Sequence, residues 1–152
     1  MKVVIQRVKN ANVKINGEVK AEIGLGMLCF IGFKYDDTLY DIEYILKKIT
    51  GLRIFDDPAG KMNISITNVS GNILIVPNFT LYASCLRGNR PDFANAADAD
   101  AGKKLFETLQ NESQKYSGIN FKFGVFRAAM EIELINDGPI TIIIDSSDKF
   151  SN

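Results

Sequence analysis

Histidine is absent from all 152 residues of the sequence. Its absence excludes a Ser-His-Asp triad, a Cys-His pair and any zinc site built on histidine ligands. The two cysteines, Cys29 and Cys85, are too few to form a thiolate metal site, so neither a metal nor another cofactor is expected. Any enzymatic chemistry must therefore come from carboxylates, lysines, hydroxyls, backbone groups or the substrate itself.

Net charge and long apolar runs are also missing. Eighteen basic residues balance 18 acidic ones, which argues against a general nucleic-acid binder and against DNA as a partner, although a local RNA contact remains open. The longest uncharged apolar stretch, residues 23–33, is far shorter than the roughly 20 residues that span a bilayer. The first seven residues resemble a strand and not a signal peptide. We therefore expect a cytoplasmic protein with no membrane contact, with Cys29 in the core and Cys85 in a loop.

The length fits one domain with a real core, which we place at residues 1–145, followed by a polar and loose tail at 146–152. Asn16-Gly17 predicts a type I′ hairpin, because both positions of that turn need positive φ. Apolar runs and polar–apolar alternation predict strands at residues 3–8, 12–15, 18–23, 26–33, 73–76, 121–125, 130–135 and 140–145.

Two helices are predicted. The first begins at a capping box formed by Thr38 and Asp41 and ends at Gly51, the expected C′ residue. Its buried face is expected to hold the apolar residues at helical spacing, namely Leu39, Ile42, Ile45, Leu46 and Ile49. The second runs from about residue 99 to 116, with Gly118 beyond its end and three residues facing inward, Leu105, Phe106 and Leu109. The fold class is therefore α+β: a largely antiparallel, barrel-like sheet with two packed helices.

Three segments are candidates for chemistry. Pro77-Asn78-Phe79-Thr80-Leu81 follows an apolar strand at the point where proline stops ladder pairing, although a plain strand exit is also possible. Asn136-Asp137-Gly138-Pro139-Ile140-Thr141 lies between two predicted strands, and its local sequence alone favours an ordinary hairpin turn over a functional site. Arg87-Gly88-Asn89-Arg90-Pro91 carries two arginines that suit phosphate oxygens, or that are simply solvated in a loop.

In combination and in order, these segments resemble the D-aminoacyl-tRNA deacylase family, also called D-tyrosyl-tRNA deacylases. The resemblance runs from residue 1 to about residue 145. Besides the three segments above, it is carried by Ile5-Gln6-Arg7-Val8, Gly51-Leu52-Arg53-Ile54-Phe55, Gly60-Lys61-Met62-Asn63 and Gly124-Val125-Phe126 with Met130.

One family motif is altered. It usually reads Ser-Gln-Phe-Thr-Leu, where this chain has Pro77-Asn78-Phe79-Thr80-Leu81. A related family, the animal-type tRNA deacylase that tolerates some L-aminoacyl substrates, also has proline at the first position. Phe79 and the rest of the chain match the D-specific family better. Asparagine is shorter than the usual glutamine, which could orient the terminal adenosine of the tRNA.

The resemblance implies an enzyme that hydrolyses the ester of D-aminoacyl-tRNA, and of glycyl-tRNA, in chiral proofreading. It implies a homodimer in which Gly138-Pro139, in cis, enters the partner's pocket, rejects L-amino acids and is braced by Arg7. The Thr80 N–H would serve the ester carbonyl as an oxyanion-hole donor. Asn78 and Phe79 would belong to the catalytic motif together with Thr80. Phe79, Phe126 and Met130 would help shape the pocket, and Arg87 and Arg90 would contact the RNA.

Other functions stay open at this point. Thr80 could act as a side-chain nucleophile, although no lysine or carboxylate adjoins it in sequence to serve as its base. The altered motif could relax the chirality of a deacylase. A non-catalytic RNA-binding dimer of the same fold is a different class of function. The absence of histidine fits substrate-assisted hydrolysis, since an aminoacyl ester is reactive and a neighbouring ribose hydroxyl can assist attack.

Overall fold

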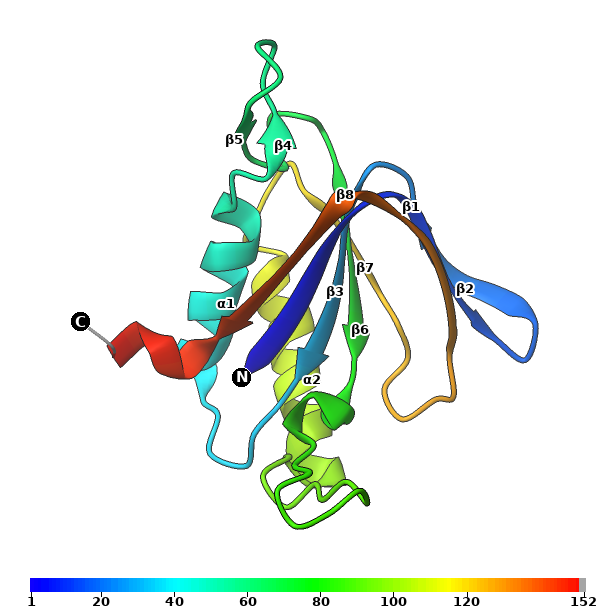
Figure 1. Ribbon diagram of the computed structural model, residues 1–152, viewed down its shortest axis with the longest axis vertical. Helices are drawn as coiled ribbons and strands as arrows, with labels where there is room; N and C mark the ends of the chain where they lie inside the picture. The colour runs from blue at the N-terminus through cyan, green and yellow to red at the C-terminus, as the bar shows by residue number, and fades with distance from the viewer. Residues whose placement is uncertain (151–152) are drawn as a thin grey trace.

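The computed structural model describes residues 1–150, and side chains through residue 148 (Figure 1). Its elements are, in chain order, β1 Lys2–Ile15, β2 Glu18–Ile23, β3 Gly26–Gly32, α1 Leu39–Gly51, β4 Phe55–Asp56, β5 Met62–Ile64, β6 Asn72–Pro77, the short 3₁₀ helix η1 Phe79–Tyr82, α2 Ala99–Ser113, β7 Asn120–Phe123, β8 Glu131–Asp145 and the 3₁₀ helix η2 Ser146–Phe150. No helix among the described residues is long and apolar enough to cross a membrane.

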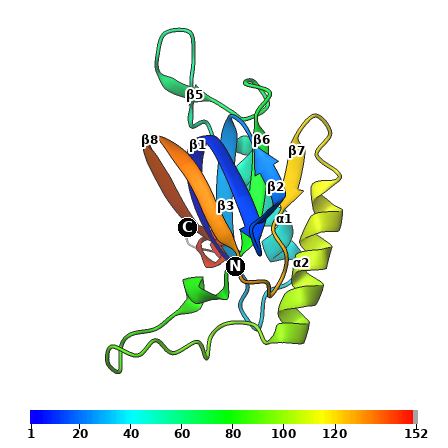
Figure 2. The same cartoon turned by 90° about the vertical axis from the view of Figure 1, so that its right-hand side faces the viewer.

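The main sheet is organised around β1. Its strand order is β2-β1-β3-β6-β7, and β8 pairs with β1 as well. Strand β1 is antiparallel to β2, β3 and β8, whereas β3–β6 and β6–β7 are parallel pairs. The expected α+β fold with a barrel-like sheet is confirmed, with two parallel pairings that the sequence did not predict. Strands β1 and β8 bend strongly over the sheet (Figure 1), and both helices cover its other face (Figure 2).

Alternation along the central strands divides the core into two clusters. In β3, Cys29 and its odd-numbered neighbours pack under the helices, while Leu28 faces the other side of the sheet. In β6, Ile73 and Ile75 follow the first pattern, and Leu74 follows the second. Because side chains alternate across a strand, a sheet covered on both faces needs apolar residues at nearly every position. The curled part of the sheet supplies the second cover.

The predicted hairpin and both helices are present. Asn16 and Gly17 have φ of 52° and 80°, as a type I′ turn requires. At the start of α1, the backbone N–H and the hydroxyl of Thr38 both donate to Asp41 Oδ2, at 2.9 and 2.8 Å. The predicted core thiol is confirmed, because Cys29 is fully buried, whereas Cys85 is exposed.

Details at the helix ends were predicted wrongly. Leu39 is 45% exposed, because the first helical residue lies beyond the edge of the core that Ile42 begins to contact. Gly51 is the last residue of α1, followed by Leu52, and is not in the left-handed conformation of a C′ glycine. Helix α2 ends at Ser113, earlier than expected, and a series of turns then leads to Gly118 at φ 86°.

The strands predicted at residues 130–135 and 140–145 are one strand, β8, so a hairpin turn between them is wrong. Strand β1 pairs with both halves in the same direction, with Gln6 opposite Thr141 and Val8 opposite Asn136. Two residues along β1 therefore correspond to five along β8, and the three extra residues bulge out of the ladder. The expectation of a loose tail also fails at Ser146, which is buried and begins η2. Residues 151 and 152 lie outside the described residues.

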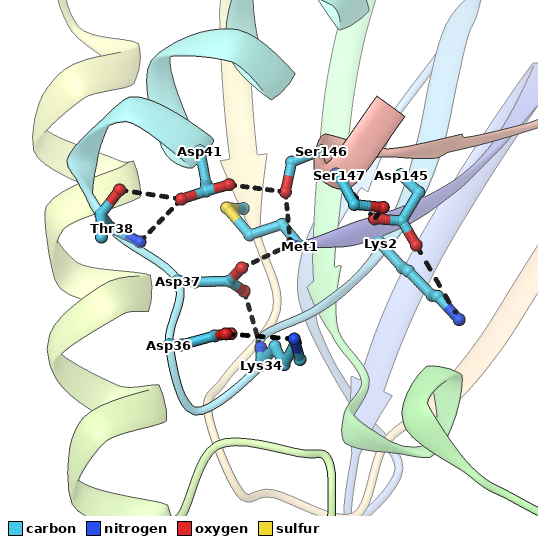
Figure 3. A network of polar contacts seen from close by, with 10 residues as sticks. All are labelled: Met1, Lys2, Lys34, Asp36, Asp37, Thr38, Asp41, Asp145, Ser146 and Ser147. Atoms are coloured by element: carbon cyan, nitrogen blue, oxygen red, sulfur yellow. Dashed lines mark hydrogen bonds and ion pairs between the residues drawn. The ribbon is translucent and has the colours of Figure 1, made fainter. Parts of the chain in front are cut away.

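A buried polar network joins the start of β1 to two distant segments (Figure 3). The ammonium of Met1 donates to Asp37 Oδ1 and to Ser146 Oγ, both at 2.6 Å. Ser146 donates in turn to Asp41 Oδ1 at 2.7 Å. Burial raises the pKa of the Asp37 carboxyl, although hydrogen bonds from the Lys34 N–H and the ammonium oppose that shift. The network ties β1, the beginning of α1 and the end of β8 together.

We expect the substitution Asp37→Asn to lower the free energy of unfolding by about 3 kcal/mol, because the Met1 ammonium would stay buried without its counter-charge. Urea denaturation measures the change. The matched control is Asp36→Asn, since the Asp36 side chain is 52% exposed in its ion pair with Lys34. That control is expected to change stability by less than about 1 kcal/mol. Equal effects of the two substitutions would contradict the role given to the network.

Candidate active site

A pocket of about 540 Å³ opens where β3 and β6 end. Four of the residues that the sequence singled out line it together: Asn78, Phe79, Phe126 and Met130. The remainder of its wall is mostly apolar and comes from the ends of β3 and β6, the start of α2 and the start of β8, namely Phe30, Ile31, Phe33, Val76, Pro77, Ala97, Ala99, Gly102, Arg127, Ala128 and Ile132. An apolar cavity with few polar groups is typical of a small-molecule or aminoacyl site.

Asn78 organises the floor of this pocket. Pro77 is the last residue of β6, opposite Ile31, and the Asn78 N–H still donates to the Ile31 carbonyl at 2.7 Å. The Asn78 side chain then caps η1, because its Oδ1 accepts from the Thr80 N–H at 3.2 Å and from the Thr80 hydroxyl at 2.6 Å. Thr80 itself lies beside the pocket and is exposed. The backbone N–H that the sequence proposed as a catalytic donor is therefore held by Asn78 in the free chain.

The wall opposite η1 is built from aromatic stacking on α2. Phe126 stacks on Phe106 with ring centroids 5.9 Å apart. A Cβ at Gly102 would lie 3.1 Å from Phe126 Cζ, so the absence of a side chain there lets the ring lie close against the helix. On the other side, Phe79 meets Phe93 edge to face at 5.0 Å. The pocket is thus lined by rings fixed by their own neighbours.

The bulge of β8 carries the second candidate motif. The Gly138–Pro139 peptide bond is cis, and Gly138 has φ 156°. A Cβ on Gly138 would lie 2.3 Å from the backbone nitrogen of Ile140, so only glycine fits. Asn136 closes the bulge with two hydrogen bonds to Ile140, accepting from its N–H at 2.9 Å and donating to its carbonyl at 3.1 Å. Both Gly138 and Pro139 are exposed at the tip.

Arg7 holds this bulge from below. Its side chain is only 8% exposed, and its Nε donates to the Asp137 carbonyl at 3.0 Å and faces the Asp137 carboxylate at 3.2 Å. Its Nη1 donates to the Ile54 carbonyl at 2.8 Å and to Asp56 Oδ2 at 3.3 Å. One guanidinium therefore joins β1, β4 and the residue that precedes Gly138.

The pocket and the bulge lie at opposite ends of the sheet. Val8 pairs with Gly26, the first residue of β3, and with Asn136 at the base of the bulge. The part of the pocket lining on β3 begins at Phe30, near the other end of that strand. Four residues of strand separate the two positions by about 13 Å. In Figure 1, β4 lies at the end that carries the bulge, and η1, the short green helix that follows β6, lies at the end that carries the pocket. Within one chain, the bulge does not reach the pocket.

The loop arginines are not part of the pocket lining. Arg87 and Arg90 are exposed in a loop that is closed by two backbone hydrogen bonds between Ser84 and Asp92. Sequence reasoning missed Arg127, which does line the pocket and has φ 64°. Nothing in the sequence around Arg127 distinguished it from a solvated arginine. Cys29 is buried, and burial raises the pKa of its thiol, so it stays protonated and inert.

Comparison with known proteins decides the family. A family model described as D-Tyr-tRNA(Tyr) deacylase matches residues 4–145. The chain belongs to this family. Because the family is one of hydrolytic enzymes, the chain is an enzyme.

Relatives of the deacylase family match along the whole chain. A D-aminoacyl-tRNA deacylase of Dictyoglomus turgidum (strain DSM 6724 / Z-1310) is 50% identical, covering 97% of this chain and 94% of that protein. One from Geobacillus sp. (strain WCH70) is 46% identical, with 100% and 99% covered. The solved structure of a protein named c-Myc DNA Unwinding Element Binding Protein has a TM-score of 0.90 at 35% identity, covering 95% of this chain and 98% of that one. The structure of a probable eukaryotic D-amino acid tRNA deacylase has a TM-score of 0.79 at 17% identity over 94% and 97% of the two chains, which shows the shared fold.

Arg7→Lys is expected to loosen the bulge of this deacylase-family chain. A lysine ammonium is a single point charge and cannot replace the two-sided contact with Asp137 and Ile54. Loss of one charged hydrogen bond of about 1.5 kcal/mol corresponds to roughly tenfold faster exchange of the Ile140 amide. Hydrogen exchange of residues 136–141 measures this. The control is Arg53→Lys, since Arg53 instead contacts Asn63 on β5. Unchanged exchange in Arg7→Lys would show that Arg7 does not hold the bulge.

Proposed function

We propose that the chain hydrolyses the ester bond between a D-amino acid and the 3′ end of tRNA, releasing the free amino acid and tRNA. Membership in the deacylase family and the names of its relatives support this reaction. The observation that carries the proposal within the molecule is the apolar pocket, whose floor presents Asn78 next to the Thr80 N–H. A pocket of this kind offers space for an aminoacyl group and one donor for its carbonyl.

In the proposed mechanism, the ester carbonyl replaces Asn78 Oδ1 as the acceptor of the Thr80 N–H. The donor then stabilises negative charge as it develops on the carbonyl oxygen during attack by water. The Thr80 hydroxyl is a poor nucleophile here, because it donates at 2.6 Å to an amide oxygen, which cannot act as a base. Assistance from the ribose 2′-hydroxyl fits a chain without histidine. Asn78 thus positions the donor before the substrate arrives.

The bulge of a second copy of the chain would distinguish D- from L-amino acids. Gly138 and Pro139 are exposed at a tip, far from the pocket of their own chain, and Arg7 holds them in one conformation. A homodimer would place each tip in the pocket of its partner. Its carbonyls would hold the substrate's α-amino group and leave no room for an L side chain. The exposed apolar residues Ile135 and Ile143, 53% and 70% exposed on the same strand, give β8 the character of an interface.

We also place the reaction in the cytoplasm, as proofreading of the tRNA pool before translation. In this proposal, residues 1–145 act as one catalytic domain, and the loop with Arg87 and Arg90 contacts the RNA outside the pocket. Two exposed arginines in a chain of zero net charge give a local and modest contact. The proposed site makes no contact specific to the side chain of the D-amino acid, so many D-amino acids are accepted.

A substrate panel tests the proposal. We expect hydrolysis of D-Tyr-, D-Asp- and Gly-tRNA, and negligible hydrolysis of L-Tyr-tRNA, because glycine has no side chain for the filter to exclude. Release of labelled amino acid from charged tRNA measures each rate. Hydrolysis of L-Tyr-tRNA as fast as D-Tyr-tRNA would instead indicate the relaxed chirality suggested by Pro77. Binding of tRNA without hydrolysis of any substrate would indicate a non-catalytic RNA-binding dimer.

Gly138→Ala completes this test, because the added Cβ collides with Ile140 and reshapes the tip. We expect all three hydrolysis rates to fall together while thermal unfolding remains cooperative. Mixing this variant with an inactive pocket variant distinguishes the two arrangements of the site. If the tip acts in the partner's pocket, mixed dimers recover activity in one of their two sites. If mixing recovers nothing, the tip does not act across the dimer.

Thr80 provides a matched pair of variants that separate the backbone donor from the hydroxyl. Thr80→Ala keeps the N–H and is expected to retain substantial activity. Thr80→Pro removes the N–H and is expected to lower kcat about 10²- to 10³-fold, the usual effect of losing one oxyanion donor. Circular dichroism and thermal unfolding serve as the folding control. A loss approaching ~10⁴-fold in Thr80→Ala would support a Thr80 nucleophile.

The role of the ribose is tested with a substrate whose terminal nucleotide lacks the 2′-hydroxyl. Full turnover of this substrate would exclude assistance by the ribose.

A further inference from the structure

Arg127 is a cation with an unusual position. Among the described residues that line the pocket, it is the one charged side chain. Its guanidinium makes no hydrogen bond or ion pair with any residue that the structure describes. In contrast, Arg7 donates a hydrogen bond to the Asp137 carbonyl, and Arg53 donates one to the Asn63 carbonyl. Arg127 is exposed, and its donors are thus available to an anion at the edge of an apolar cavity.

The loop that carries Arg127 is fixed on both sides. Before it, the Gly124 N–H donates to the Ile75 carbonyl of β6 at 2.8 Å. Next to it, Phe126 is stacked against α2, and the Ala128 N–H donates to the Val125 carbonyl at 3.2 Å, which closes a turn. Contacts on each side of Arg127 therefore determine where its backbone lies. A long side chain on a fixed turn searches a limited volume at the mouth of the pocket.

The backbone conformation at this position does not favour arginine. Arg127 has φ 64°, in the left-handed region that glycine adopts without a steric penalty and other residues rarely enter. Non-glycine residues in that region concentrate at binding and catalytic sites. No contact of the guanidinium with a described residue accounts for this conformation. Asp98 precedes the pocket-lining Ala99, but its Oδ1 caps α2 by accepting from two backbone N–H groups, and it makes no ion pair with Arg127 among the described residues.

We propose that Arg127 binds a phosphate of the tRNA 3′ end, the phosphodiester preceding the terminal nucleoside. This inference rests on the proposed deacylase function. The planar guanidinium fork matches two phosphate oxygens. Every substrate carries this phosphate whatever amino acid is attached, so the contact positions all of them alike. A carboxylate on the side chain of an acidic D-amino acid is the other anion available, and it is present in a few substrates only.

The test compares Arg127→Gly with Arg127→Lys on D-Tyr-tRNA and D-Asp-tRNA. Glycine suits φ 64°, so the unfolding temperature of Arg127→Gly is expected to stay equal or rise, and lost activity cannot come from lost folding. We expect kcat/KM to fall about 10- to 100-fold for both substrates, mainly through KM, with partial recovery in Arg127→Lys. The slope of log(kcat/KM) against log[salt] is expected to become shallower by about 0.7 to 1.

Lys20→Gln is the control, because it removes one positive charge from the exposed β2, where Lys20 pairs with Glu18. It is expected to change neither kcat/KM nor its salt dependence. A loss confined to D-Asp-tRNA would overturn the phosphate contact and assign Arg127 to the amino-acid side chain. An active Arg127→Gly with unchanged salt dependence would overturn the inference alone. An inactive wild-type protein would instead overturn the proposed function.

Discussion

The buried guanidinium of Arg7 is the contact that connects the fold to the site. Arginine keeps its charge at any pH that a protein meets, so a buried arginine needs acceptors on several sides. Arg7 finds them in β4 and in the bulge of β8, and no other residue type could span that set. Its position on β1 follows from the pairing of β1 with β3 and β8. The geometry of the Gly138-Pro139 tip therefore depends on the whole sheet and not on local turn preferences.

Chemistry without histidine is consistent with what surrounds Thr80. A backbone N–H can donate a hydrogen bond without any shift of a side-chain pKa. In the free chain, the Thr80 N–H donates to Asn78 Oδ1, which holds it in place. The asparagine that stands where the family usually has glutamine is thus in direct contact with the proposed donor. Its shorter side chain reaches two residues along its own helix. In the proposed mechanism, substrate binding exchanges one acceptor for another, so the donor never has to become unpaired.

The pocket combines an apolar wall with Arg127, a cation that pairs with no side chain among the described residues, and these suit two parts of the proposed substrate. Phe79, Phe126 and Met130 offer surface to an apolar group, while Arg127 offers a charge to an anion. Arg127 is one of three described non-glycine residues in the left-handed region, with Asn16 and Ser70, and of the three it is the one that lines the pocket. Such exceptions are expected where a residue serves binding and the rest of the structure compensates for the conformation.

The sequence by itself determined the α+β class, the Asn16-Gly17 hairpin, the capping box at Thr38 and most of the buried faces, because these depend on neighbours within a few residues. The order of its motifs also pointed to the family. Tertiary structure decided what distant residues share. It joined two predicted strands into β8, because β1 pairs with both halves in the same direction on either side of the bulge, and it fixed Ser146 through the Met1 ammonium. It brought Arg127 to the pocket and separated the bulge from that pocket by most of the length of β3. No local pattern records these pairings, since residues far apart in the chain become neighbours only when the sheet closes.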